Sequence, residues 1–77
     1  MNNNRNTLKG WIYANFGDYS TLAKHLAIDV STVSHWSNSN PRNMLRFLPE
    51  LCNLTKADAN DILDAVVARE NEIVEVD

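Results

Sequence analysis

The stretch GDYSTLAKHLAIDVSTVSHWSNSNP, residues 17–41, decides how the chain folds, because its apolar side chains follow two different helical phases. Leu22 and Leu26 share one phase. Val33 and Trp36 share another. A single helix would keep one phase throughout, so this stretch predicts two consecutive helices that each bury an apolar stripe.

The junction between these two helices has the residues of a short turn. Asp29 is a good N-cap for the second helix, and Ile28 is an apolar residue inside the turn that we expect to be held in the core. The small side chain of Ala23 lets the second helix cross the first at close range. We therefore predict a first helix from Tyr19 to about Leu26 and a second one over about 30–38.

The second helix has two unlike faces when its residues advance by about 100° each. Val33 and Trp36 lie on one side, which we assign to the core. The opposite face carries short polar side chains and no Asp or Glu: Ser31, Ser34, His35 and Asn38. Such residues have low helix propensity but short hydrogen-bonding reach, which suits the groove of a nucleic acid.

Helix signals continue on both sides of this pair. We predict an N-terminal helix over roughly Thr7 to Phe16, with Gly17 as its stop. Asn40 and Pro41 form an N-cap and a first helical position, so a fourth helix starts there. Pro49 predicts a kink or an early break in that helix.

A fifth helix follows a capping pair formed by Thr55 and Asp58. Its apolar residues recur every three or four positions over residues 59–67. We therefore predict that residues 1–70 form a single all-α domain, a compact bundle of about five short helices, and that residues 71–77 form an acidic tail. The tail fits a frayed end, a short strand or a dimer contact, and its apolar residues are Ile73, Val74 and Val76.

The formal net charge of −3 is unevenly distributed along the chain. Residues 1–48 hold five basic and two acidic side chains, whereas residues 49–77 hold two basic and eight acidic ones. The part of the chain that contains the paired helices therefore carries a positive net charge. The overall acidity does not exclude a nucleic-acid partner.

Several function classes find no support in the sequence. There is no nucleophile with a base at a supporting spacing and no glycine-rich phosphate loop, so we expect no enzyme. The only cysteine, Cys52, has no metal-binding spacing to His25, and we expect no metal, cofactor or small-molecule ligand. The N-terminus has no secretory signal and no stretch is long enough to span a membrane, so we expect an intracellular protein.

The paired helices resemble a known family of DNA-binding proteins. The residues that carry the resemblance are Leu22-Ala23, Leu26, Ile28-Asp29, Val33-Ser34 and Trp36. Their pattern is similar to the helix-turn-helix of the phage Cro and repressor class, also called Xre-like, and the run IDVSTVSHW over residues 28–36 resembles the CII-type activators of lambdoid phages. The resemblance implies a lambda-repressor-like fold. It also implies a small phage or prophage transcription regulator, dimeric or higher, that binds a double-stranded DNA operator in the cytoplasm of a bacterial host cell.

The same resemblance assigns contact residues. It puts four side chains over base edges: Val30, Ser31, Ser34 and His35. It puts two more, Thr32 and Asn38, at the margins of that contact. It puts Tyr19 and Ser20, at the start of the first helix of the pair, against the phosphate backbone. Arg42, in the loop beyond the second helix, is expected beside the same strand and is favoured over Arg46 as a phosphate contact.

Two departures from the family pattern stand out. The family often has glycine where this chain has Ala27, and a left-handed alanine there costs about 1 kcal/mol relative to glycine. The groove-facing residues also include no Gln, Arg or Lys, which removes the strongest bidentate base contacts. We therefore expect sequence reading to depend on Ser and His hydrogen bonds, on methyl contacts and on DNA shape.

Two other interpretations remain open. One is a helical adaptor or antirepressor that binds a protein through the same scaffold, and it would tolerate changes at Ser31, Ser34 and His35. The other is an unrelated bundle in which the pair are merely core helices. Under the DNA interpretation we expect a symmetric homodimer across two half-sites, formed through spare apolar positions of the fifth helix or through the tail.

Overall fold

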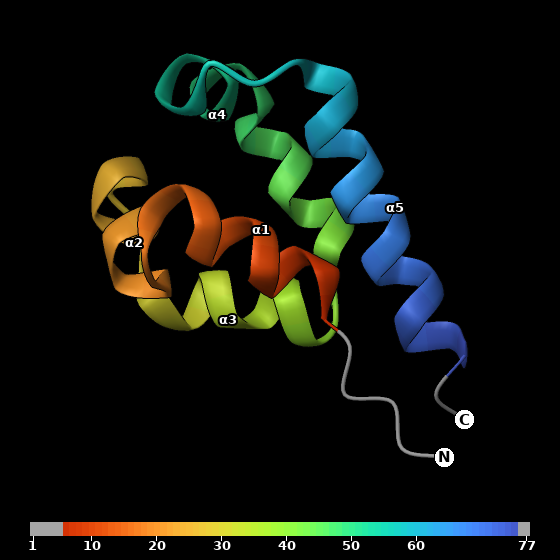
Figure 1. Cartoon of the computed structure of the whole chain (residues 1–77). Coiled ribbons are helices and arrows are strands. Elements are labelled where there is room, and N and C mark those ends of the chain that lie inside the picture. The colour runs from red at the N-terminus through yellow and green to blue at the C-terminus, as the bar shows by residue number, and fades with distance from the viewer. Residues whose placement is uncertain (1–5, 76–77) are drawn as a thin grey trace.

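Helices account for nearly all of residues 6–75, the part of the chain that the computed structural model describes (Figure 1). The helices, in chain order, are α1 Thr7–Phe16, α2 Tyr19–Leu26, α3 Val30–Asn38, the 3₁₀ helix η1 Pro41–Phe47, α4 Leu48–Thr55 and α5 Ala59–Glu75. Residues 6–75 contain no strand. The predicted all-α bundle of short helices is confirmed.

Capping residues set the limits of α1 and the start of α2. The Asn6 side chain accepts a hydrogen bond from the Lys9 amide at 3.0 Å. Gly17 ends α1 with a φ of 93°, a value that favours glycine. The Asp18 carboxylate then accepts a hydrogen bond from the Thr21 amide at 2.8 Å, and this bond lowers the pKa of that carboxyl. The two helices are therefore joined by only residues 17 and 18.

Backbone hydrogen bonds hold the turn between α2 and α3. The Ile28 amide donates to the Ala23 carbonyl at 3.0 Å and closes the end of α2. Ala27 is left-handed, with φ 57° and ψ 45°. Asp29 occupies the N-cap position of α3, but its side chain makes no capping hydrogen bond. The first backbone bond there runs instead from the Thr32 amide to the Asp29 carbonyl, at 3.0 Å.

The expected fourth helix is divided into η1 and α4. Pro41 begins η1, and α4 begins at Leu48 with Pro49 in its first turn. Proline has no amide hydrogen, but in the first turn this costs no hydrogen bond, because the first amides of a helix have no partner inside the helix. The early break expected from Pro49 is thus observed. Lys56 ends α4 in a left-handed conformation with a φ of 60°.

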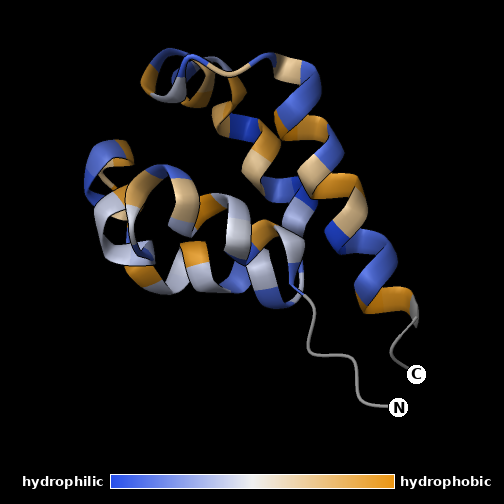
Figure 2. Ribbon diagram, in the orientation of Figure 1, coloured by the Kyte–Doolittle hydropathy of each residue, from blue (hydrophilic) through white to orange (hydrophobic). Residues whose placement is uncertain are grey.

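Helix α5 continues into the segment for which we expected a tail. Residues 71–75 are helical, so the strand alternative does not hold for them. Val76 and Asp77 lie outside the described residues. The helix packs against α1 and η1, and its hydrophobic and hydrophilic residues alternate along its length (Figures 1 and 2).

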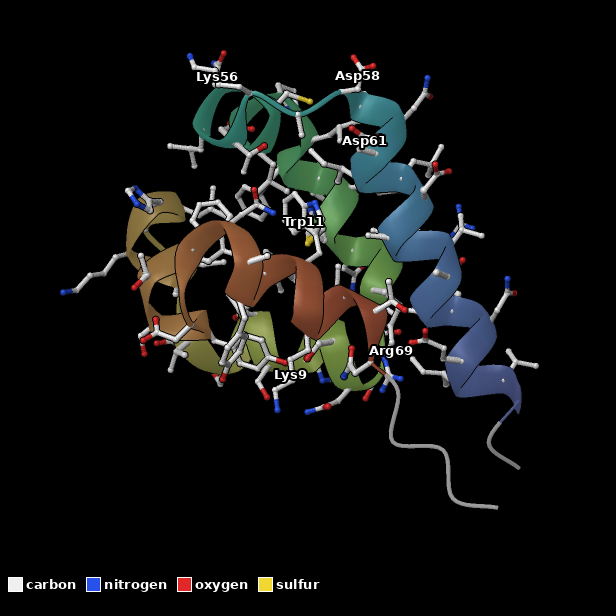
Figure 3. All side chains as sticks on the ribbon, in the orientation of Figure 1. Lys9, Trp11, Lys56, Asp58, Asp61 and Arg69 are labelled. Atoms are coloured by element: carbon white, nitrogen blue, oxygen red, sulfur yellow. The ribbon has the colours of Figure 1, made fainter. Side chains whose placement is uncertain are left out.

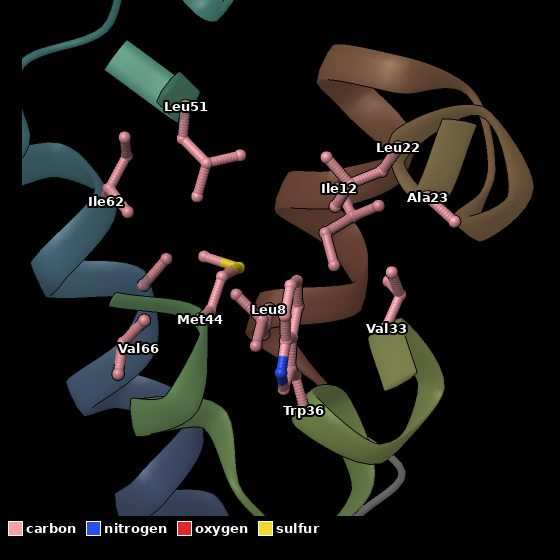
Figure 4. Close-up of a cluster of buried hydrophobic side chains, with 11 residues drawn as sticks. Leu8, Ile12, Leu22, Ala23, Val33, Trp36, Met44, Leu51, Ile62 and Val66 are labelled. Atoms are coloured by element: carbon pink, nitrogen blue, oxygen red, sulfur yellow. The ribbon is translucent and has the colours of Figure 1, made fainter. Parts of the chain in front are cut away.

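The core is formed by residues from every helix. Val33 and Trp36 of α3 are 0% and 3% exposed, as the phase of that helix predicted. The side chains labelled in Figure 4 point into one common interior between α3, η1, α1 and α5. The buried hydrophobic residues are Leu8, Ile12, Leu22, Ala23, Val33, Trp36, Met44, Leu51, Ile62, Ala65 and Val66.

Candidate nucleic-acid interface

One side of α3 is exposed along the whole helix. Because Val33 and Trp36 anchor the helix in the core, the opposite side is turned to solvent. All of the predicted groove-facing residues except Ser34 are exposed, and Ser34 is half-buried. We refer to this surface as the α3 face, and it consists of Val30, Ser31, Thr32, Ser34, His35 and Asn38.

Hydrogen bonds order the C-terminal half of the α3 face. The Asn38 amide donates to the Ser34 hydroxyl at 3.2 Å. The side-chain nitrogen of Asn40 lies 2.7 Å from Nε2 of His35. When the Asn40 amide donates in this pair, Nε2 is the acceptor and the remaining ring hydrogen sits on Nδ1. Asn40 was expected only as a helix cap, and its contact with the imidazole was missed.

An open groove of about 820 Å³ runs between α3 and η1. Its lining includes Trp36 and Phe47, whose ring centroids are 5.6 Å apart. The polar side chains that line the α3–η1 groove are Ser31, Thr32, His35, Asn43 and Arg46. All of them can donate a hydrogen bond and none is an Asp or a Glu. The groove therefore places a cation beside the α3 face.

The two predicted phosphate contacts at the start of α2 differ in their surroundings. Ser20 is exposed in the first turn of α2. Tyr19 is half-buried, and its hydroxyl hydrogen-bonds to the buried hydroxyl of Ser37. Its ring also packs edge-on against Tyr13, with centroids 5.6 Å apart. The Tyr19 hydroxyl is therefore engaged within the protein.

Arg42 is paired with an acid of α5. Its Nε and Nη2 donate to the two carboxylate oxygens of Glu70, each at 2.8 Å. The carboxylate raises the pKa of the guanidinium. The pair borders a second groove between η1 and α5, which also includes Asn40 and Asn43. The α3–η1 groove is lined by Arg46 instead.

The 3₁₀ geometry of η1 explains why Arg42 and Arg46 lie on different sides. In an α-helix, residues four apart share a face. In a 3₁₀ helix, with three residues per turn, it is residues three apart that align, so Asn43 and Arg46 form one row and Arg42 lies outside it. Sequence reasoning assumed an α-helix from Pro41. The alignment of Asn43 with Arg46 was therefore missed.

A cluster of polar side chains fixes the C-terminal end of α3. The Ser37 carbonyl accepts hydrogen bonds from Asn6, at 3.2 Å, and from Nε of Arg69. Arg69 in turn lies 3.5 Å from the carboxylate of Glu72, and Figure 3 shows it reaching from α5 toward the start of α1. The cluster therefore ties α3 to both α1 and α5.

Glu72 closes the cluster at the first turn of α1. Its carboxylate accepts hydrogen bonds from the Thr7 amide, at 2.9 Å, and from the Thr7 hydroxyl. Burial by itself would raise the pKa of Glu72, but the hydrogen bonds from Thr7 and the charge of Arg69 outweigh it, and the net effect is a lowered pKa. No periodicity in the sequence indicated this contact.

Two of the acids lie away from the α3 face, whereas Asp29 directly precedes it at the N-cap of α3. Asp58 and Asp61 stand near the connection between α4 and α5, at the opposite end of the molecule from Lys9 and Arg69 (Figure 3).

Within residues 6–75, no cluster of His, Cys, Asp and Glu is suited to a metal ion. None of the described helices is both long enough and apolar enough to cross a membrane. Comparisons with protein-family models, with curated proteins and with solved structures gave no match.

Proposed function

We propose that this protein is a sequence-specific double-stranded DNA-binding transcription regulator that places α3 in the major groove. The observation that carries the proposal is the α3 face, a largely exposed row of side chains that can hydrogen-bond at every position except Val30, that contains no carboxylate and that is bordered by Arg46. A major groove about 12 Å wide admits an α-helix. Short Ser, Thr and His side chains suit a helix that lies close to the base edges.

Phosphate contacts would flank that helix on two sides. Ser20 is exposed in the first turn of α2, beside the Asp18 cap, and its hydroxyl can donate a hydrogen bond to a phosphate. On the other side, Asn43 and Arg46 line the α3–η1 groove. Contacts of this kind fix the register of a protein on the duplex, while the α3 face supplies the sequence preference. The protein would act in the cytoplasm of a bacterial host cell.

A homodimer belongs to the same proposal, because one recognition helix covers only a few base pairs. Helix α5 exposes three large apolar side chains: Leu63 at 38%, Val67 at 37% and Val74 at 74% exposure. They are four and seven positions apart and so lie along one side of the helix. Pairing of this side with a second copy would bury them and join two α3 helices into one unit.

The test is a triple variant in which Ser31, Ser34 and His35 become alanine. Wild-type protein should enrich one short, roughly two-fold-symmetric site from a random duplex library, with an affinity that falls as salt rises. The triple variant should lose that enrichment and keep its melting temperature, because all three residues lie outside the core.

A matched control removes polar side chains elsewhere. Asn53 and Asn60 are exposed on α4 and α5, and their alanine variants should bind as the wild type does. Equal binding by the triple variant, or the absence of any enrichment by the wild type at low salt, would contradict the proposal. Either result would favour a scaffold that binds a protein.

A further inference from the structure

The Arg42–Glu70 pair joins two segments that the chain separates by 28 residues. Both hydrogen bonds are 2.8 Å long, and together they use one edge of the guanidinium. The Arg42 side chain is 66% exposed and that of Glu70 is 29% exposed. The contact is therefore well formed but open to solvent on the Arg42 side.

Arg42 lies close to the α3 face even though it faces α5. Asn40, two residues earlier, contacts His35, and Asn43, the next residue, lines both the α3–η1 groove and the groove that contains the pair. A duplex seated on the α3 face would bring its backbone near this corner of the protein. The guanidinium fork fits a phosphate as well as it fits a carboxylate.

We propose that Glu70 is a built-in competitor for a DNA phosphate at Arg42, so that binding exchanges the carboxylate for the phosphate. This inference rests on the proposed function. An exposed ion pair changes an equilibrium constant by up to about fivefold, which is weak enough for a phosphate to displace it. Glu70 then lowers the affinity for DNA in two ways. It holds the Arg42 guanidinium in the free protein, and it repels the DNA backbone in the complex.

The experiment is a double-mutant cycle on the full chain with Glu70→Gln, Arg42→Ala and both together. The affinity for the duplex that the wild type enriches is measured across a salt series. Glu70→Gln should bind about twofold to fivefold more tightly than the wild type. Arg42→Ala should bind more weakly and with a shallower salt dependence. In the Arg42→Ala background the gain in affinity from Glu70→Gln should be smaller than in the wild type, because only the repulsion between Glu70 and the DNA backbone is left to remove.

Asp64→Asn is the matched control, because Asp64 is an exposed acid of the same helix without a hydrogen bond or ion pair among the described residues. It changes the net charge by the same amount and leaves Arg42 paired. An equal gain in affinity for Glu70→Gln and Asp64→Asn would overturn the competitor role while leaving DNA binding intact. Absence of DNA binding by the wild type would overturn the proposed function and this inference together.

Discussion

The hydroxyl of Tyr19, in the first turn of α2, donates a hydrogen bond to the hydroxyl of Ser37, near the end of α3. The Ser37 hydroxyl donates its single hydrogen to the Ser34 carbonyl at 3.1 Å. It has no second hydrogen, so in the bond with Tyr19 it must be the acceptor. Ser37 is fully buried. This bond fixes the start of α2 against the end of α3 and helps to set the angle at which the α3 face is presented.

Removal of the Tyr19–Ser37 bond should lower stability. Tyr19→Phe and Ser37→Ala are each expected to reduce the free energy of unfolding by about 1 kcal/mol. Because both substitutions remove the same bond, the double variant should lose much less than the sum of the two single losses, as denaturant titration of all four proteins would show. Strictly additive losses would contradict this account.

Ala27→Gly should stabilise the protein by up to about 1 kcal/mol, because glycine adopts the left-handed conformation of Ala27 without steric cost. The gain is limited by the greater freedom of glycine in the unfolded chain. Thermal unfolding provides the measurement. Ala14→Gly is the control, since Ala14 is an exposed residue inside α1, and there the same change should destabilise by about 1 kcal/mol.

Glu72 should make the protein sensitive to acid. The pKa of Glu72 is lowered in the folded state from its ordinary value of 4.5, so its contribution to stability is present above that value and is lost as the pH falls through the folded-state pKa. At neutral pH, Glu72→Gln should therefore lower the free energy of unfolding by about 1–2 kcal/mol.

The difference between wild type and Glu72→Gln should shrink toward zero as the pH falls below 4.5, the ordinary pKa of a glutamate. Urea titrations over a series of pH values would follow it. Asp64→Asn, which removes an exposed acid that has no hydrogen bond or ion pair within residues 6–75, should show no comparable difference at neutral pH. A Glu72→Gln effect that stays constant down to low pH would exclude an ionic role for this carboxylate.

Arg46→Ala should weaken DNA binding to all sequences alike. Loss of one phosphate contact is expected to reduce the slope of log K against log salt by about 1 without changing the preferred site. The control is Lys56→Ala, which removes an exposed cation at the far end of the molecule (Figure 3). Equal effects of the two variants would assign the loss to overall charge and would remove Arg46 from the interface.

The sequence was most informative where local signals decide the structure. The bounds of α2 and α3, the turn between them and the burial of Val33 and Trp36 followed from caps and apolar phase over about twenty residues. These same signals separated the α3 face from the core. They were sufficient because each depends on neighbours within one or two helical turns.

Contacts between distant segments could not be predicted in the same way. The partner of Arg42 is 28 residues away, and no periodicity links η1 to that position of α5. The 3₁₀ form of η1 was also missed, because Pro41 is an equally good first residue for an α-helix. As a result Arg46, and not Arg42, lines the α3–η1 groove.

The bond between Thr7 and Glu72 has a consequence for the order of folding. The amide at the first position of α1 finds its carboxylate 65 residues further along the chain. During synthesis Thr7 is made long before Glu72, so its amide lacks this carboxylate partner until α5 has been added to the chain. Closing so long a loop costs chain entropy before the contact forms. We therefore expect the nascent chain to stay unfolded until its last helix has emerged and then to fold in a single cooperative step.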